Sequence, residues 1–136
     1  MASTTPIAKL RVLVVDDDEL DRFVIRRSFS SIGQSVEVIE IEDSSHAVEA
    51  IEEHQPDVTI LDIQMPKMNG FEVLQALSRS TASDTAEVMM LSSSSYPEDK
   101  TKALELGASA YRTKPSTLDD YVRLAEDIHA TYFKRL

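Results

Sequence analysis

Apolar runs typical of buried strands alternate along the chain with segments whose apolar residues recur at helical spacing. Residues 10–15 are almost entirely aliphatic and β-branched, as in a strand that is buried on both faces. From Glu19 onward, apolar side chains recur at helical spacing until Gly33, a residue typical of helix ends. The same alternation continues along the chain. It predicts strands at 10–15, 36–41, 57–61, 87–91 and 109–113, and helices at 19–32, 44–55, 70–77, 97–106 and 117–133.

Five successive strand–helix units indicate an α/β fold. Right-handed crossovers place the helices on both sides of a parallel sheet, so each strand is covered on both faces. We expect a flavodoxin-like (βα)5 architecture with a five-stranded parallel sheet in the order 2-1-3-4-5. The chain has 136 residues and no internal repeat or linker. It therefore corresponds to one domain, residues 9–136, after a flexible N-terminal tail at 1–8.

The composition narrows the classes of partner and compartment. Lys and Arg number 14 against 24 Asp and Glu, which gives a formal net charge of -10. We find no basic patch. An acidic surface repels nucleic-acid phosphates and anionic membranes, so we expect contact with neither. Cysteine is absent, which removes disulfides and thiolate chemistry. Because the chain lacks a secretory signal and an apolar run of about 20 residues, we expect it to be cytoplasmic.

Chemically versatile side chains are concentrated where the predicted strands end. They are Asp16, Asp17 and Asp18 after the first strand, Asp62 after the third, Ser92 to Ser95 after the fourth and Lys114 after the fifth. Ligands of open α/β sheets bind at the carboxyl ends of the strands, and the first and third strands are neighbours in the expected order. We therefore expect the carboxylates to converge on one spot, beside a hydroxyl and an ammonium.

Converging carboxylates favour a bound cation. Two of them at about 4 Å repel by roughly 4 kcal/mol at an effective dielectric of about 20, and a divalent ion relieves that repulsion. Oxygen ligands with several waters suit octahedral Mg²⁺. An EF-hand is excluded, because the sixth position counted from Asp16 is Asp21, where that motif needs Gly. A flavin-phosphate site is excluded because the loop after the first strand is acidic, whereas phosphate requires backbone amides.

Several motifs resemble those of the receiver domain of two-component response regulators. They are VVDD at 14–17, LDIQMPKMNG at 61–70, MLSS at 90–93, GASAY at 107–111 and KP at 114–115. They occur in the order usual for that family and extend over about residues 9–128. The resemblance implies a phosphoprotein in which an aspartyl phosphate forms with Mg²⁺ as cofactor.

The resemblance also implies roles for individual residues. Asp62 corresponds to the phosphoacceptor, and Ser92 and Lys114 to residues that contact the phosphoryl group. Ser92 and Tyr111 correspond to the pair that switches. Gln64 and Ser94 correspond to side chains that flank the approach of water and tune the phosphate lifetime. The implied ligands of Mg²⁺ are Asp16, Asp17, Asp62 and the backbone carbonyl of Gln64.

Two positions differ from the commonest pattern of the family. Ser92 stands where Thr is more usual, which keeps the hydroxyl and removes a methyl group. Ser116 follows Lys114-Pro115 where Phe is frequent. The resemblance points to a cis bond between Lys114 and Pro115, whereas X–Pro bonds in general are mostly trans, so both isomers stay open.

The function implied by the resemblance is signalling by a protein that is not an enzyme and catalyses only its own phosphorylation and dephosphorylation. Its phosphodonor would be a histidine kinase or a histidine phosphotransfer protein, and its output a phosphorylation-dependent contact with another protein. Because about 20 residues follow Pro115, we expect a stand-alone, chemotaxis-type receiver. The alternatives are a phosphorelay intermediate or phosphate sink, and a scaffold independent of phosphorylation. A haloacid-dehalogenase-type phosphohydrolase is set aside, because Gln64 replaces the second Asp that it needs.

Overall fold

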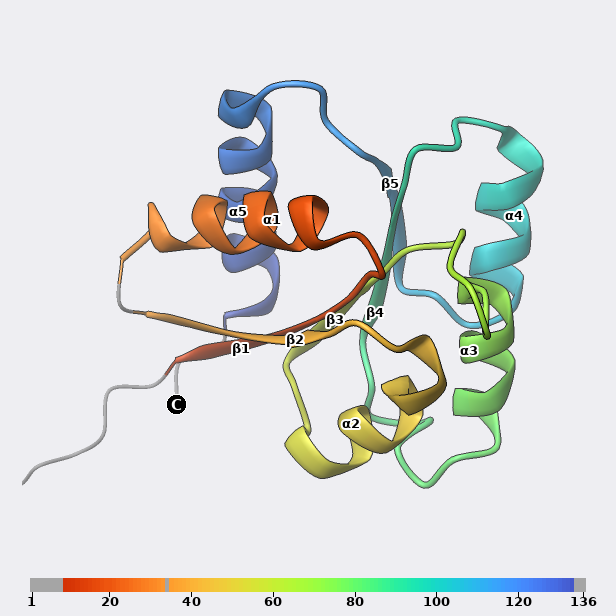
Figure 1. Cartoon of the computed structure of the whole chain (residues 1–136). Coiled ribbons are helices and arrows are strands. Elements are labelled where there is room, and N and C mark those ends of the chain that lie inside the picture. The colour runs from red at the N-terminus through yellow and green to blue at the C-terminus, as the bar shows by residue number, and fades with distance from the viewer. Residues whose placement is uncertain (1–8, 34, 134–136) are drawn as a thin grey trace, which may run out of the picture.

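The computed structural model describes residues 9–33 and 35–133, and Figure 1 shows their alternating strands and helices. The strands are β1 (Leu10–Val15), β2 (Val36–Ile41), β3 (Val58–Leu61), β4 (Val88–Ser92) and β5 (Ala110–Thr113). The helices are α1 (Glu19–Ser30), a 3-10 turn η1 (Ser44–His46), α2 (Ala47–His54), α3 (Gly70–Ser78), α4 (Pro97–Glu105) and α5 (Leu118–Tyr132). The predicted tail at 1–8 lies outside the described residues.

Every predicted strand and helix is present, with ends that differ by at most a few residues. The prediction that Gly33 ends the first helix is wrong, because α1 stops at Ser30 and Ser31 is its C-cap. The second helix starts later than predicted. Asp43 caps a 3-10 turn there by accepting from the Ser45 N–H at 3.0 Å, and α2 follows that turn.

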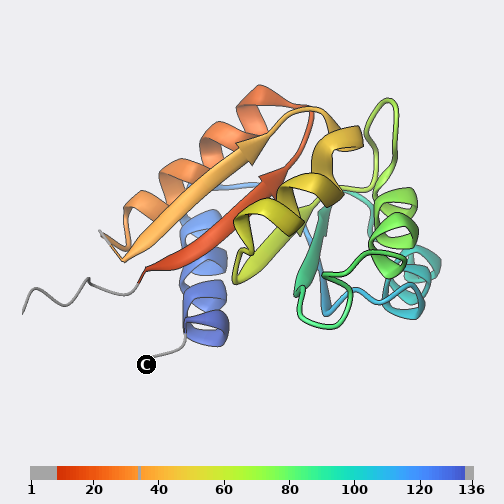
Figure 2. The ribbon, with the colours of Figure 1, turned by 90° about the horizontal axis from the view of Figure 1, so that it is seen from below.

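The sheet has the predicted order, β2-β1-β3-β4-β5, and its strands pair in parallel. Helices α1 and α5 cover one face, and α2, α3 and α4 cover the other (Figures 1 and 2). Side chains of β1 alternate between these layers, with Val12 and Val14 on the α1 side and Leu13 and Val15 on the other. Because helices cover both faces, β1, β3 and β4 are apolar at almost every position.

Strand register brings two of the predicted site residues to the same edge. Val15 of β1 pairs with Leu61 of β3, so Asp16 and Asp62 occupy the next position on neighbouring strands. The ladder continues one step further, because the Asp62 N–H donates to the Val15 carbonyl at 3.3 Å. The Asp16 N–H donates to the Ile41 carbonyl at 3.2 Å. These bonds fix the main chain of both acids at the carboxyl edge of the sheet.

The structure also bears on the Lys114-Pro115 bond and on membrane-spanning helices. No peptide bond is cis in the part of the chain that the structure describes, so the Lys114-Pro115 bond is trans. Among residues 9–33 and 35–133, no helix is long and apolar enough to cross a membrane.

Gly70, the first residue of α3, lies directly against the end of β3. A Cβ atom built on Gly70 would lie 2.3 Å from the Asp62 carbonyl oxygen and 2.8 Å from Met90 Cε. The Gly70 N–H donates to the Ile63 carbonyl at 2.8 Å, which holds the two segments at this close approach. A side chain larger than hydrogen would therefore displace the main chain of Asp62.

We predict that Gly70→Ala lowers the free energy of unfolding by about 1 to 3 kcal/mol, because the Asp62 backbone must move to admit the methyl group. By helix propensity alone, alanine would stabilise the helix relative to glycine by up to about 1 kcal/mol. A loss of stability therefore indicates the clash, and a gain indicates helix propensity. Urea unfolding followed by circular dichroism measures the change. Gln75→Ala, at an exposed position of the same helix, is the control. A Gly70→Ala protein as stable as wild type would contradict the prediction.

Candidate functional site

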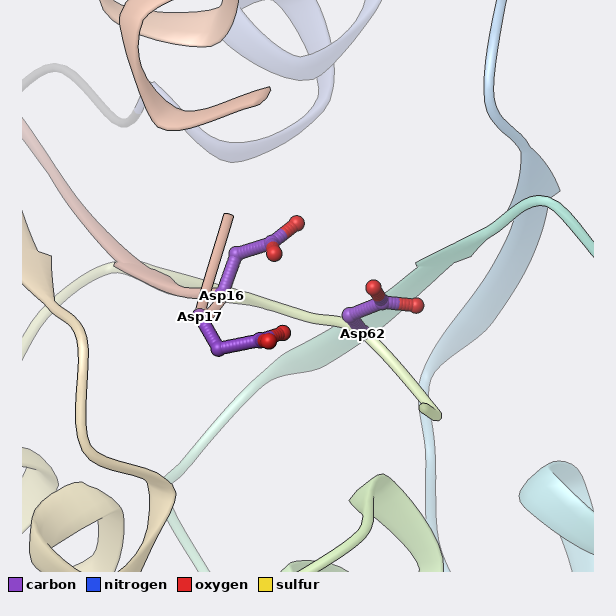
Figure 3. A group of neighbouring side chains, drawn as sticks. All are labelled: Asp16, Asp17 and Asp62. Carbon is purple, nitrogen blue, oxygen red and sulfur yellow. The ribbon is translucent and has the colours of Figure 1, made fainter. Parts of the chain in front are cut away.

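Three carboxylates meet at the carboxyl edge of the sheet (Figure 3). Asp16 and Asp17 follow β1 and Asp62 follows β3, as the strand ends predicted. One ligand atom from each residue lies within 4.8 Å of the other two. Asp16 and Asp62 are buried, whereas Asp17 is exposed. This arrangement suits a hard cation that binds carboxylate oxygens and is reached from solvent.

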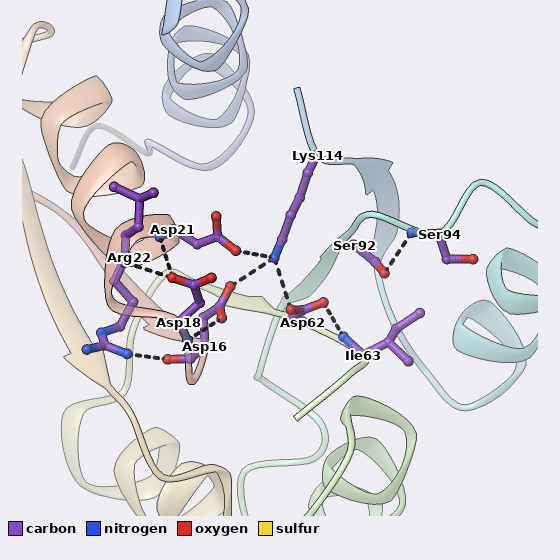
Figure 4. A network of polar contacts seen from close by, with 10 residues as sticks. Asp16, Asp18, Asp21, Arg22, Asp62, Ile63, Ser92, Ser94 and Lys114 are labelled. Carbon is purple, nitrogen blue, oxygen red and sulfur yellow. Dashed lines mark hydrogen bonds and ion pairs between the residues drawn. The ribbon is translucent and has the colours of Figure 1, made fainter. Parts of the chain in front are cut away.

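Lys114 reaches this acid trio from the end of β5 (Figure 4). Its Nζ lies 3.2 Å from Asp16 Oδ2, 3.0 Å from Asp62 Oδ2 and 2.6 Å from Asp21 Oδ2. The Lys114 N–H donates to the Ser92 carbonyl at 2.8 Å, which ties the end of β5 to the end of β4. The structure thus brings the ammonium to the acids at the edge where the sequence placed it.

The site carries more negative charge than one ammonium balances. Burial raises the pKa of Asp16 to about 6, although the hydrogen bond from the Asp18 N–H and the charge of Lys114 oppose this rise. Burial alone would lower the pKa of Lys114. Hydrogen bonds to Asp21 and Asp62 outweigh that effect and hold the Lys114 pKa above its usual range. Lys114 is therefore cationic, and a divalent ion would relieve the remaining repulsion among the acids.

Buried polar contacts fix the loop that carries Asp16. Arg22 on α1 is buried, and its Nη1 donates to the Asp16 carbonyl at 2.6 Å. The same guanidinium lies 3.3 Å from the Glu40 carboxylate on β2, which balances its charge. Asp16 Oδ1 accepts from the Asp18 N–H at 2.9 Å. The Asp16 carboxylate is therefore oriented by its own loop, and its main chain by α1.

Asp21 is a site residue to which the sequence analysis assigned no role. Asp18 caps α1 by accepting from the N–H groups of Leu20 at 2.8 Å and Asp21 at 3.4 Å. This cap sets the start of the helix, and the first turn then directs the Asp21 carboxylate to Lys114 (Figure 4). The sequence feature that could have pointed to Asp21 is an acidic residue in the first turn of a helix that starts at the site.

The loop between β3 and α3, which carries Gln64, is held by the segment after β2. The buried Ser44 Oγ donates to the Pro66 carbonyl at 3.0 Å and accepts from the Met68 N–H at 3.2 Å. The Gln64 side chain is exposed. Ser44, which the sequence analysis did not single out, therefore fixes the loop that contains the predicted metal-binding carbonyl.

A series of short polar contacts leads from Ser92 toward α4 and β5. Ser92 is buried, and its Oγ accepts from the Ser94 N–H at 3.2 Å. The Ser94 carbonyl accepts from the hydroxyl of the half-buried Tyr111 at 2.8 Å. Ser94 Oγ donates to Asp99 in the first turn of α4. The Ser94 hydroxyl thus points toward α4 and away from Asp62 (Figure 4), although the resemblance placed Ser94 beside the path of water.

A doubly wound parallel sheet with an acid cluster and a lysine at its carboxyl edge is typical of one class of α/β domain. The model of the response regulator receiver domain matches residues 12–126, and the chain belongs to this family. This confirms the family and the fold that the sequence predicted. Receiver domains are signalling modules of two-component systems.

Two relatives that are similar in sequence are longer than this chain. Response regulator MprA of Mycobacterium sp. (strain KMS) is 37% identical over 111 residues, which are 82% of this chain and 46% of that protein. The gliding motility regulatory protein of Myxococcus xanthus is 38% identical over 110 residues, which are 80% of this chain and 14% of that protein. The chain thus spans about half the length, or less, of these curated relatives.

Solved structures share the fold. The phosphorylated cyanobacterial phytochrome response regulator RcpA has a TM-score of 0.82 over 93% of this chain and 96% of that one, and at 23% identity it supports the fold alone. The signal receiver domain of NarL from Mycobacterium tuberculosis is 34% identical, with a TM-score of 0.75 over 90% and 98% of the two chains. The response regulator domain of Thermotoga maritima CheB is 30% identical, with a TM-score of 0.75 over 92% and 94%.

We predict that Asp16 makes the metal-free protein less stable as the pH rises from about 4 to about 6. The pKa of Asp16 is about 6 in the folded protein and 3.8 in its ordinary state. Within this window the folded state binds more protons than the unfolded state, so stability falls with pH. Asp16→Asn cannot ionise and should exceed wild type in stability by a margin that grows to about 1 to 3 kcal/mol.

Urea unfolding in EDTA at several pH values between about 4 and 7 measures this margin. Asp84→Asn, which removes an exposed carboxylate away from the site, should show no comparable pH-dependent margin. A constant margin for Asp16→Asn across the window would show that burial does not destabilise the Asp16 carboxylate.

Proposed function

We propose that the chain is a response regulator that accepts a phosphoryl group on Asp62, with Mg²⁺, from a histidine kinase or a histidine phosphotransfer protein. One observation carries the proposal. The buried Asp62 carboxylate lies within reach both of the Asp16 and Asp17 carboxylates and of the Lys114 ammonium. The family to which residues 12–126 belong supports the same chemistry.

Asp62 is the nucleophile of this reaction. A carboxylate oxygen attacks phosphorus while the bond from phosphorus to the donor's histidine nitrogen breaks, and the nitrogen keeps the electron pair. Asp62 Oδ1 accepts from the Ile63 N–H at 2.7 Å, and Oδ2 accepts from Lys114. These contacts orient the carboxylate, and phosphoryl transfer depends mainly on such positioning and on neutralising the phosphoryl oxygens.

The proposed ligands of Mg²⁺ are Asp16, Asp17, Asp62 and the backbone carbonyl of Gln64. The donors fit this ion, because they are all oxygens and the three carboxylates offer ligand atoms within 4.8 Å of one another. When bound, Mg²⁺ neutralises charge on the acids and on the phosphoryl oxygens. The Ser92 hydroxyl and the Lys114 ammonium supply further contacts to those oxygens.

The phosphoryl group carries about -1.5 to -2 charges, which draw the Ser92 hydroxyl and Lys114 toward Asp62. Ser94 follows, because its N–H donates to Ser92 Oγ and its carbonyl holds the Tyr111 hydroxyl. The change thereby reaches the surface of α4, β5 and α5. We take this surface to be the one that binds a downstream protein.

The remaining expectations concern the setting in which the domain works. The net charge of -10 supports a protein partner over nucleic acid or an anionic membrane, and we propose a cytoplasmic location. That the regulator is a single domain stays a prediction, because the chain spans 46% of the MprA relative. Return of phosphate from Asp62 to a histidine phosphotransfer protein would support the phosphorelay alternative.

We predict that Asp62→Asn abolishes Mg²⁺-dependent incorporation of phosphate from acetyl phosphate, because a neutral amide lacks the anionic carboxylate oxygen that attacks phosphorus. Intact-protein mass spectrometry, with and without EDTA, measures the incorporation. Asp84→Asn removes the same charge at an exposed position and should incorporate phosphate like wild type. A hydroxylamine-labile phosphate on the Asp62→Asn protein would refute the assignment of the phosphoacceptor.

Gln64 and Ser94 are proposed to tune the lifetime of the aspartyl phosphate without being required for its formation. We predict that Gln64→Arg slows decay of the phosphoprotein by roughly threefold or more, because a bulky cation near Asp62 hinders the in-line water and pairs with the phosphoryl oxygens. Gln75→Arg, at an exposed position on α3, is the matched control. Equal decay rates in both variants and wild type would show that water approaches Asp62 by another path.

A further inference from the structure

The three carboxylates around the Lys114 ammonium differ in one respect. Asp16 and Asp62 belong to the trio whose ligand atoms can hold a metal ion, whereas Asp21 does not. Asp21 is nevertheless the nearest partner, with its Oδ2 at 2.6 Å from Nζ, against 3.0 Å for Asp62 and 3.2 Å for Asp16. The nearest partner of the ammonium is therefore the one carboxylate of the three that is not a possible metal ligand.

A metal ion and Lys114 share two carboxylates, those of Asp16 and Asp62. An ammonium has three N–H donors, and in this structure each has a carboxylate acceptor. A divalent cation bound to Asp16 and Asp62 would draw on the two carboxylates that Lys114 now contacts, and it would repel the ammonium. The Lys114 side chain is only 14% exposed, so expulsion to solvent would require the side chain to move out of a largely buried position.

We propose that Asp21 is a positioning residue that keeps Lys114 in the site while a divalent cation binds Asp16, Asp17 and Asp62. The proposal rests on the proposed function, because it assumes the metal site and the contact of Lys114 with the phosphoryl group. Asp21 provides an anchor outside the metal ligands, so that cation binding leaves at least one of the three contacts of Lys114 in place. Lys114 then remains beside Asp62 for the phosphoryl group.

The start of α1 fixes Asp21 in the required place. Asp18 caps the helix and accepts from the Asp21 N–H, and Arg22 on the next position is anchored to the Asp16 carbonyl at 2.6 Å. The Asp21 side chain is 27% exposed, which leaves its carboxylate partly solvated beside the ammonium. Glu19 in the same turn is exposed. Among the contacts of the described residues, Glu19 makes none with Lys114, so it offers a matched control for charge.

Calorimetric titration with MgCl₂ tests the proposal in six proteins: wild type, Lys114→Ala, and the substitutions Asp21→Asn and Glu19→Gln made in each of these two. Both single substitutions remove one negative charge from the first turn of α1. We expect Asp21→Asn to raise the dissociation constant for Mg²⁺ by about two- to fivefold more than Glu19→Gln does, which is the scale of a partly exposed ion pair. In the Lys114→Ala background the two substitutions should have equal effects, because Asp21 acts through Lys114.

Two results would overturn the role of Asp21. One is an equal effect of Asp21→Asn and Glu19→Gln when Lys114 is present, and the other is an excess effect of Asp21→Asn that persists without Lys114. Neither result touches the proposed phosphoacceptor, which the Asp62→Asn experiment tests separately. Absence of any Mg²⁺ binding by the wild-type protein would instead refute the proposed metal site, and the role of Asp21 with it.

Discussion

The excess of negative charge at the carboxyl edge of the sheet is the constraint on which the rest of the structure depends. Parallel pairing of β1 with β3 places Asp16 and Asp62 at equivalent ends of neighbouring strands, so their main chains cannot separate without breaking the ladder. The Lys114 ammonium offsets part of this charge, yet burial still raises the pKa of Asp16 to about 6. Burial of the Asp16 carboxylate, to which repulsion from Asp62 adds, destabilises the metal-free fold, and a bound divalent cation would relieve both.

The remainder of the fold holds these charges in place. Apolar layers on both faces of the sheet keep β1 and β3 buried, and such burial contributes roughly 25 cal/mol per Å² of apolar surface. Three contacts then fix the loops at the edge. Arg22 holds the loop after β1, Ser44 holds the loop after β3, and Gly70 lets α3 approach the main chain of Asp62. Core packing therefore offsets the cost of the acid cluster, and polar contacts determine its geometry.

Much of this could be predicted from the sequence, and the physical reason is periodicity. Apolar runs and helical spacing located the strands and helices, and parallel topology then required Asp16 and Asp62 to meet. Contacts that depend on the direction of single side chains were not predictable. The start of the first helix at Glu19 was predicted correctly, but the rotamers that turn Asp21 to Lys114 and Ser94 to Asp99 were not. Such rotamers are not encoded in the pattern of apolar and polar residues.

The contacts of Ser94 bear on how the proposed switch would reach two elements at once. A serine hydroxyl has one hydrogen to donate and two lone pairs to accept with, and the Ser94 N–H occupies one lone pair of Ser92 Oγ. Ser92 can therefore donate to a phosphoryl oxygen without releasing Ser94, so a shift of Ser92 toward Asp62 draws Ser94 along. Ser94 holds β5 through the Tyr111 hydroxyl and α4 through Asp99. Because both contacts belong to one residue, α4 and β5 would respond to the phosphoryl group together and not in sequence.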